Sequence, residues 1–349
     1  MDTIQISIVL KEEKLRKVTF ADLQVAAQYI NEIKSVYGYK YCDCLEISRT
    51  GNLIVKISYP RFFAGINAYL ISSNMECLQV QLEFCLNINN HPLMCDAEIG
   101  LSRVDIPFTF MMAQGYDFNS YRKVYQVLDY VYRKKNLNSN SMAYTNVSEY
   151  EPGTIIYSDH PQRAKYNKRV MFYDQYNNLK SKTEDGEKFN SIVVEYCELS
   201  RRLRIEMASR IRRVPVSIQD FPDYSIFSTY LPQFKEHILY SLFDLNEVNN
   251  FYNEKSVELA NKILRYREET TNFLYETFIY KEVERIHDYE IIRRALKICI
   301  DNIKTREKAI TVIRKVLFKY QLNENVIVMD TYNTIVQMKR VIETYYGDI

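Results

Sequence analysis

The sequence predicts an α+β protein in which an antiparallel sheet with flanking helices is followed by an all-α C-terminal domain. Short stretches of alternating apolar and polar residues recur through the first two thirds of the chain, whereas helical spacing fills almost everything after residue 234. The chain has 349 residues, 47% of them hydrophobic and 26% charged, which is typical of globular proteins and long enough for two domains. We expect a sheet-containing domain over residues 1–225 and a helical domain over 226–349.

The first half of the chain alternates between the two periodicities. Residues 19–37 carry apolar side chains at three- and four-residue spacing, which predicts a helix, and residues 120–134 repeat this pattern. Residues 52–58 and 101–110 alternate apolar and polar side chains, which predicts strands. Residues 75–88 fit either a strand or a helix, and the helix is slightly favoured.

The following segment begins with polar residues and continues with short strands. Residues 136–153 predict a loop. Further strands are expected at 154–158, at 169–174 and, broken around 199–201, within 191–207. Three prolines then indicate a linker to the helical domain: Pro215, Pro222 and Pro232.

Composition also bears on where the protein resides. No apolar run approaches the roughly 20 residues that a membrane-spanning helix needs, and the N-terminus lacks the basic, apolar and small-residue order of a signal peptide. Seven cysteines, an odd number, favour reduced thiols. We therefore expect no membrane association and a cytoplasmic location in a prokaryotic cell.

Positive charge is concentrated in one stretch. The net charge of the whole chain is only +2, yet residues 163–213 contain 13 Lys and Arg against 7 Asp and Glu. Aromatic residues lie between these basic clusters, as they do on surfaces that bind a nucleic-acid backbone. A solvated charged face explains the same composition, so both interpretations stay open.

Polar residues of three predicted strands point away from the apolar face. Arg103 and Asp105 lie two residues apart in one strand, and Arg204 and Glu206 do so in another. In a third strand, Tyr173 alternates with apolar residues and follows basic ones. Two strands thus each offer Arg-x-carboxylate, and the third offers a phenol.

These residue types suit phosphodiester chemistry. Two carboxylates can bind Mg²⁺ or Mn²⁺ through oxygen, and arginines bind phosphate oxygens as forks. A phenol has a pKa of about 10 and needs such help to attack, after which it would leave a covalent phosphotyrosyl ester. Taken singly, carboxylates such as Asp105 and Glu206 are more often surface salt-bridge partners of neighbouring Arg. Tyr173 is one of 30 tyrosines, most of which are packing residues.

The order of these motifs resembles that of rolling-circle replication initiators, of the filamentous-phage gene II/X type and the plasmid trans-acting Rep type. Those families have a strand with Arg-x-Asp, a strand ending in Tyr-Asp or Tyr-Asn, and a strand with Arg-x-Glu, in this order. Residues 51–67 are also similar to the phage proteins' strand followed by Pro, Phe and Gly-x-Asn. The resemblance covers residues 52–210, about half of the chain.

The resemblance implies a metal-dependent nickase that cuts one strand of an origin and stays attached to the 5′ phosphate. By position, Tyr173 would be the nucleophile, and Asp105 and Glu206 would hold Mg²⁺ or Mn²⁺. Basic residues around them are expected to contact DNA, namely Arg103, Lys168, Arg169, Arg202 and Arg204. The expected partners are origin DNA, single-stranded or supercoiled, a host helicase and a single-strand-binding protein, and a homodimer is one option.

Two departures from the family pattern keep other functions open. Gln175 stands where the family has Lys, and Thr109 stands where plasmid relatives have a second acidic residue. Both would suit a non-catalytic DNA-binding protein that controls replication or copy number. A structural or host-interaction protein whose strands only imitate the motif order is a third interpretation.

Other cofactor and motor signatures are missing from the sequence. Its 4 histidines are widely spaced, which excludes a histidine-pair metal site of the usual spacing, and no Gly-rich phosphate loop of the P-loop pattern is present. A strand-opening motor must then be a partner. The C-terminal helices carry basic residues at 304–308 and 314–315, which fit either a helix-turn-helix that binds DNA or a packing domain with a solvated face.

Overall fold

The computed structural model describes residues 1–136, 144–146, 154–160, 165–184, 201–271, 273–286, 288–324 and 329–345. It divides into two compact units. Unit 1 comprises Met1–Met112, Ser141–Ile238 and Ile342–Ile349, and unit 2 comprises Ala113–Asn140 and Leu239–Val341. The single boundary predicted between residues 225 and 226 therefore does not describe this chain, because the two units alternate along the sequence.

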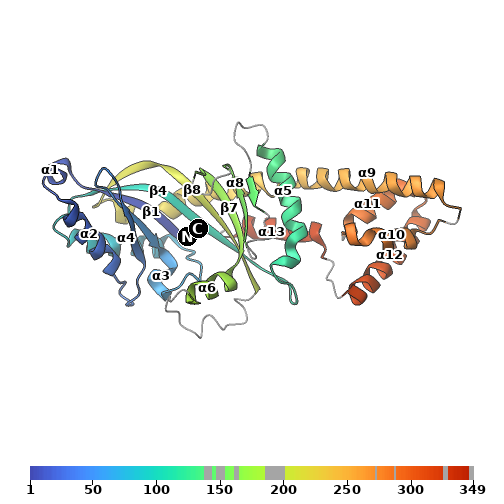
Figure 1. Cartoon of the computed structure of the whole chain (residues 1–349), viewed down its shortest axis with the longest axis horizontal. Helices are drawn as coiled ribbons and strands as arrows, with labels where there is room; N and C mark the ends of the chain where they lie inside the picture. Colours follow the sequence, from blue (N-terminus) through green and yellow to red (C-terminus); the bar gives the residue numbers. More distant parts are fainter. Residues whose placement is uncertain are drawn as a thin grey trace. The chain divides into compact units, whose positions relative to one another are not determined.

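Unit 1 is built on one eight-stranded antiparallel sheet with the order β2-β3-β1-β4-β8-β7-β6-β5 (Figure 1). The strands are β1 (Thr3–Val9), β2 (Cys42–Ile47), β3 (Leu53–Ser58), β4 (Glu98–Met111), β5 (Tyr144–Asn146), β6 (Thr154–Ser158), β7 (Lys168–Asp174) and β8 (Arg202–Ser217). The longest strands, β4 and β8, pair with each other at the middle of the sheet. This architecture confirms the predicted α+β class with an antiparallel sheet.

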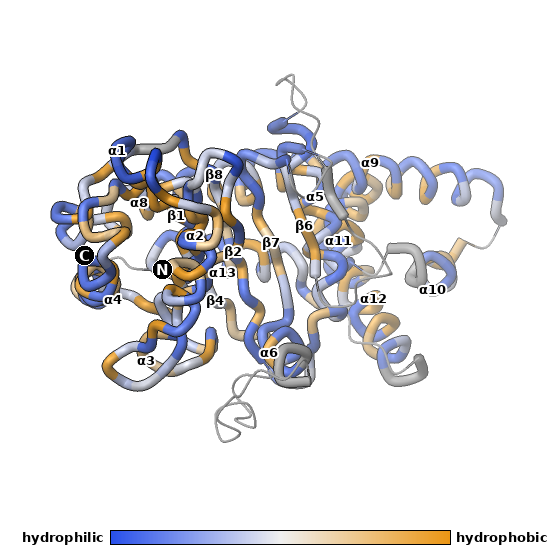
Figure 2. The backbone as a smooth tube through the Cα atoms, turned by 60° about the vertical axis from the view of Figure 1, so that its left-hand side comes forward, coloured by the Kyte–Doolittle hydropathy of each residue, from blue (hydrophilic) through white to orange (hydrophobic). Residues whose placement is uncertain are grey.

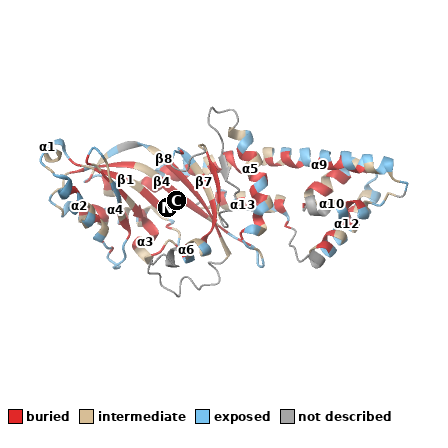
Figure 3. Ribbon diagram, viewed as in Figure 1, coloured by how far each residue is buried: buried red, intermediate tan, exposed pale blue. Residues whose placement is uncertain are grey.

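Alternation along the strands separates an apolar face from a polar one. In β1, Ile4, Ile6 and Ile8 are fully buried, and in β7 Val170 and Phe172 are buried among the same kind of side chains. The central strands are accordingly coloured as buried over most of their length in Figure 3. The alternate positions of β4, β7 and β8 carry the charged motif residues, so one face of the sheet is left for polar chemistry.

Two of the helices of unit 1 begin at capping boxes. The helices of this unit are α1 (Glu12–Leu15), α2 (Phe20–Glu32), α3 (Tyr59–Ala64), α4 (Asn74–Asn89), α6 (Gln175–Glu184), the 3₁₀ turn η3 (Phe221–Asp223) and the first part of α8 (Ile226–Ser241). Thr19 with Asp22 and Ser73 with Glu76 form capping boxes that start α2 and α4. Residues 75–88 are therefore helical, as favoured from the sequence.

Unit 2 consists of helices. They are the 3₁₀ turn η1 (Asn119–Tyr121), α5 (Arg122–Asn136), α9 (Leu245–Glu269), α10 (Tyr275–Ile286), α11 (Tyr289–Cys299), α12 (Ile303–Glu324) and most of α13 (Thr331–Thr344). Hydrophobic and hydrophilic residues alternate along α9 (Figure 2). The ring of Tyr130 on α5 lies 5.3 Å from that of Phe251 on α9, and its hydroxyl donates to Glu254 at 2.6 Å. Packing on α9 thus places α5 in the helical unit.

Several segments differ from the sequence predictions. The expected proline linker does not exist, because Pro215 lies in β8, Pro222 in η3 and Pro232 inside α8. Strands β1 and β2 and helix α6 were not predicted. Residues 191–200 lie outside the described part of the chain, as does most of the predicted loop 136–153, from which β5 is described.

Two further features can be checked in the described residues. Six cysteines are described, and all six are free thiols. Among the described helices, none combines the length and apolar character required to cross a lipid bilayer.

Candidate functional site

The strand register brings the three motifs together on the polar face of the sheet. β4, β8 and β7 are neighbours, with Pro107 opposite Glu206 on one side of β8 and Tyr173 opposite Arg204 on the other. Residues opposite each other point to the same side, as do residues two apart in a strand. Asp105, Glu206 and Tyr173 are therefore close diagonal neighbours on one face.

Direct hydrogen bonds connect these side chains. The Tyr173 hydroxyl donates to Glu206 Oε2 at 2.9 Å. Arg103 donates from Nε and Nη2 to the two oxygens of Asp105, at 2.7 and 2.6 Å. The structure thus joins the predicted nucleophile to one predicted metal ligand, while the other ligand forms a two-pronged ion pair within its own strand.

A third carboxylate, Asp2, belongs to the same cluster. It precedes β1, its backbone N–H donates to the Asp105 carbonyl at 3.1 Å, and its carboxylate hydrogen-bonds the Glu206 carboxyl. Asp2 is buried, with 1% of its surface exposed. No motif in the sequence marks it, because its position depends on β1 pairing with β4.

Residues 65–71, here called the covering segment, are hydrogen-bonded to residues of this cluster and of its neighbouring strand and helix. The Asn67 amide donates to both oxygens of Asp2, at 2.6 and 2.8 Å. Gln175 donates to the carbonyls of Asn67 and Ala68 at 3.0 and 3.2 Å, and Arg202 donates to Ala68 at 2.9 Å. Gln175 therefore holds this segment in place. Asn67 ends the Gly-x-Asn pattern, which is the sequence signal that could have identified it.

Arg204 is enclosed under the covering segment. Its guanidinium has no exposed surface, donates from Nη2 to the Asn67 carbonyl at 3.4 Å, and faces Tyr173 across the strand pair. Within the described residues, its Nε and Nη1 atoms have no hydrogen-bond partner. These donors are suited to an anion, yet solvent does not reach them in this conformation.

The other basic residues predicted to bind DNA differ in accessibility. Lys168 is exposed, whereas Arg103 and Arg202 make the hydrogen bonds given above. Arg169 is partly buried, and its guanidinium lies 4.3 Å from the centre of the Tyr166 ring, which Arg210 also approaches at 5.2 Å. A basic group stacked on a buried aromatic ring therefore lies at the start of β7.

The reactive groups are almost completely covered. Tyr173 is 9% exposed, Glu206 is 8% exposed and Asp105 is 2% exposed. The prediction that Tyr173 points away from the apolar face agrees with the register, but the residue is buried rather than in solvent. With 9% of its surface exposed, Tyr173 is not open to a DNA phosphate in this conformation.

Burial and neighbouring charges set the protonation of the cluster. Burial, followed by the negative charges of Asp2 and Asp105, raises the pKa of Glu206 from 4.5 to about 8. Burial and then the adjacent Glu206 raise the pKa of Tyr173 well above its ordinary value. Burial also raises the pKa of Asp105, although the Arg103 guanidinium opposes this shift. At pH 7 Glu206 is thus mostly neutral and Tyr173 fully protonated.

A divalent metal ion does not fit the cluster as it stands. The oxygen ligands are of the kind that Mg²⁺ or Mn²⁺ prefers, and Asn67 Oδ1 is a further buried oxygen without a hydrogen-bond partner in the described part of the chain. Both oxygens of Asp105, however, accept hydrogen bonds from Arg103. Across the described ranges, no three His, Cys, Asp or Glu side chains are arranged to hold a metal ion. An ion would require Arg103 to release Asp105.

The nearest alternative tyrosines have different surroundings. Tyr166 is stacked between two guanidiniums, and burial raises its pKa. Tyr176 lies in α6 rather than in a prolonged β7, and it packs against the buried cluster formed by Ile66, Ala68 and Leu179. Neither hydroxyl is hydrogen-bonded to a carboxylate of the described residues. The hydroxyl of Tyr173 differs from both because it is bonded to Glu206.

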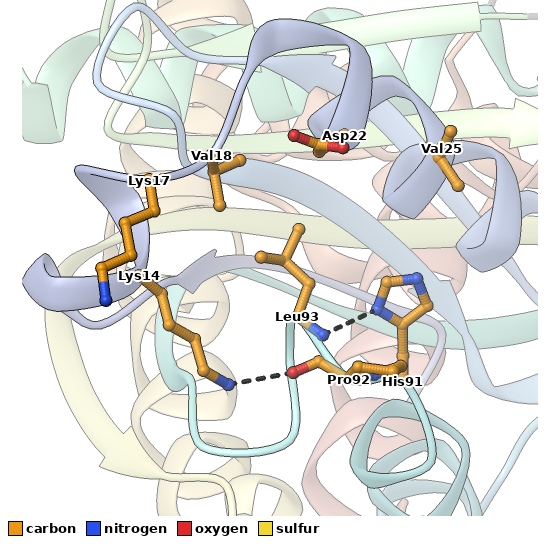
Figure 4. A pocket seen from close by; sticks show the side chains of 8 residues that line it. All are labelled: Lys14, Lys17, Val18, Asp22, Val25, His91, Pro92 and Leu93. Carbon is orange, nitrogen blue, oxygen red and sulfur yellow. Dashed lines mark hydrogen bonds between the residues drawn. The ribbon is translucent and has the colours of Figure 1, made fainter.

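A separate hollow lies between the α1–α2 segment and the connection from α4 to β4 (Figure 4). Its lining residues are Lys14, Lys17, Val18, Asp22, Val25, His91, Pro92 and Leu93. Lys14 Nζ donates to the Pro92 carbonyl at 3.0 Å, and Asp22 is used in the capping box of α2. The hollow shares no residue with the cluster, so we place the candidate site at the polar face of the sheet.

Comparison with known proteins found no match to the chain among protein-family models, curated proteins or solved structures.

Proposed function

We propose that this chain is a site-specific single-strand DNA nickase and strand transferase that starts rolling-circle replication of a phage or plasmid. The observation that carries the proposal is the hydrogen bond from the Tyr173 hydroxyl to Glu206, on the same sheet face as the Arg103–Asp105 pair. A buried phenol bonded to a carboxylate and facing a buried arginine is suited to attack on a phosphodiester. The motif order described above supplies the substrate class.

The proposed reaction exchanges one phosphoester bond for another. Tyr173 Oη attacks the phosphorus and forms a phosphotyrosyl bond to the 5′ phosphate, and the bond to the 3′ oxygen breaks. The proton of Tyr173 passes to Glu206 in the fraction of the protein whose Glu206 is ionised, which its raised pKa makes the smaller fraction at pH 7. The departing 3′ oxygen takes a proton from water to become a hydroxyl. Arg204, with two unpartnered donors among the described atoms, would bind a phosphate oxygen. A bound Mg²⁺ or Mn²⁺, if required, would withdraw charge from the phosphate.

The function can be tested with a randomised single-stranded DNA library, because the origin sequence need not be known. The protein, incubated with the library and Mn²⁺, should yield a protein–DNA adduct that survives denaturing electrophoresis. Sequencing the captured strands should return one recurrent site. A library recovered without a covalent adduct would contradict the proposal.

Metal dependence is a separate expected result of the same assay. EDTA should abolish adduct formation and added Mn²⁺ should restore it, because DNA binding that draws Arg103 away from Asp105 would free both Asp105 oxygens for the divalent ion that the resemblance implies. Asp105→Asn should lower the yield at least about 100-fold, since loss of a catalytic charge in a buried site costs several kcal/mol. Undiminished yield in EDTA would remove the metal from the proposal while leaving the tyrosine chemistry in place.

The proposal also requires the covering segment to open. Gln175→Ala removes two hydrogen bonds to its carbonyls, each contributing about 1 kcal/mol to holding the segment in place. Hydrogen–deuterium exchange of peptides spanning residues 65–71 should therefore accelerate several-fold. Gln28→Ala, which removes an exposed side-chain bond to Glu32 on α2, serves as the control and should leave this exchange unchanged. Equal exchange in both variants would contradict a segment fastened by Gln175.

The second candidate function is a non-catalytic DNA-binding regulator of replication or copy number. The observation that favours it is the use of Gln175 and Arg202 to hold the covering segment over the cluster. Such a protein would bind DNA without forming the adduct. The assay above therefore distinguishes the two functions directly.

A further inference from the structure

Helix α12 carries lysines along one side. Lys304, Lys308, Lys315 and Lys319, together with Thr311, recur at intervals of three or four residues and are all exposed. The opposite side of the helix is buried and consists of Ile310, Ile313, Leu317 and Tyr320. We call the four exposed lysines the lysine row. The buried side of α12 packs toward α10 and α11, so the lysine row faces away from these helices.

The charge of the lysine row is not neutralised within the described part of unit 2. None of its four ammonium groups makes an ion pair or side-chain hydrogen bond with a described residue. Over its whole length α12 has six basic residues and two acidic ones, Glu307 and Glu324. Its positive charge is therefore both concentrated and exposed.

Helix α5 is as basic as α12, but its basic side chains contact other residues of unit 2. Arg133 pairs with Asp129 at 2.9 Å, Lys135 forms an ion pair with Asp244, and Lys134 lies over the Tyr130 ring. The two helices are alike in sequence composition and differ in their contacts. This difference indicates that the four lysines of the row do not serve packing, as the basic residues of α5 do.

Contacts at the start of α12 and with α11 fix the helix that carries the lysine row. Asn302 caps α12 through its Oδ1, which accepts from the backbone N–H of Thr305 at 3.0 Å. Beside the row, Arg314 donates from Nε to the Tyr289 hydroxyl on α11 at 2.8 Å and stacks on its ring. α11 and α12 are separated by only residues 300–302. The helix is thus anchored at its start and along one flank.

We propose that the lysine row is a second DNA-binding surface, which contacts the phosphate backbone of double-stranded DNA. The row extends over sixteen residues, from Lys304 to Lys319, or about 22 Å of helix, and a helix of this kind fits the major groove. Lysines act there as point charges that neutralise phosphates. An anionic membrane is a poorer partner, because an interfacial helix inserts a continuous apolar side. On α12 the apolar side formed by Ile310, Ile313 and Leu317 is buried in unit 2, and the exposed large apolar residues Ile303 and Phe318 lie fifteen positions apart. The inference rests on the proposed function for its choice of DNA.

The test uses two variants of the full chain with equal loss of charge. One carries K304Q, K308Q, K315Q and K319Q. The control carries K255Q, K262Q, K281Q and K297Q, which are exposed lysines on α9, α10 and α11. Binding to a fluorescent 30-base-pair duplex is measured by anisotropy between 50 and 200 mM KCl, and circular dichroism verifies the fold.

The row variant should bind the duplex at least about 10-fold more weakly at 100 mM KCl, and its log–log salt slope should fall by about 3, close to 0.9 for each lost phosphate contact. The control should keep a slope within about 1 of the unmodified protein. An unchanged slope in a folded row variant, or equal losses in both variants, would overturn the inference.

Covalent attachment to single-stranded DNA separates this inference from the proposed function. A row variant that still forms the adduct while losing duplex affinity supports the row as a distinct surface. If the unmodified protein forms no adduct but the duplex result holds, the nickase proposal fails and the row stands. If the adduct forms and the row variant binds duplex normally, the row fails and the nickase proposal stands.

Discussion

Tyr173→Phe is expected to end covalent attachment to DNA while leaving the fold nearly unchanged. The substitution removes one oxygen, so no nucleophile remains at this position, and adduct formation should fall below detection. The ring keeps its place on β7 because it is fixed by burial. The lost hydrogen bond to Glu206 should lower the free energy of unfolding by only about 1 kcal/mol. Adduct yield and thermal unfolding measure the two effects.

Two matched variants control for the other tyrosines near the site. Tyr166→Phe and Tyr176→Phe remove the same atom from a stacked ring and from α6, and both should still form the adduct. Tryptic digestion of the adduct should place the modification on the peptide 170–180, which contains Tyr173 and Tyr176. Loss of the adduct in Tyr176→Phe alone would identify Tyr176, and not Tyr173, as the nucleophile.

The pairing of strands explains why the candidate site could be approached from sequence. Alternation within β4, β7 and β8 is a local property, so it correctly put Asp105, Tyr173 and Glu206 on the polar side of their strands. It could not show that these strands are neighbours. The motif order of the resembling families carried that expectation.

Features that depend on contacts distant in sequence could not be predicted. Asp2 joins the cluster only because β1 pairs with β4, and Asn67 covers it through hydrogen bonds from residues more than a hundred positions away. The place of α5 in the helical unit likewise depends on its packing against α9. The linker that was predicted from the prolines is wrong, since Pro215 lies within the long strand β8.

The buried carboxyl of Glu206 should make the protein less stable as the pH rises. Its pKa is about 8 in the folded chain, against an ordinary value of 4.5. Between these two values the folded state keeps a proton that the unfolded state has lost. The free energy of unfolding therefore falls by up to about 1.4 kcal/mol per pH unit across this window, and the loss is complete only above pH 8.

Glu206→Gln should remove this penalty and, with it, the activity. The amide oxygen can still accept the Tyr173 hydrogen bond, and the amide nitrogen can donate to Asp2, so the polar contacts of the neutral acid are kept. The difference in melting temperature between Glu206→Gln and the unmodified protein should be small at pH 5 and should grow by several degrees at pH 8. Adduct formation should nevertheless be lost, because the amide cannot take the proton of Tyr173.

Glu46→Gln, at an exposed position of β2, makes the same chemical change without burial and should leave the pH profile of stability unchanged. Parallel melting curves for Glu206→Gln and the unmodified protein from pH 5 to pH 9 would show that Glu206 carries no raised pKa. A variant that is more stable at pH 8 and inactive would instead mean that the folded chain keeps a destabilising buried acid where a proton acceptor is needed. Stability sacrificed at one position in this way is characteristic of active sites, and a purely structural role for Glu206 would give no reason for it.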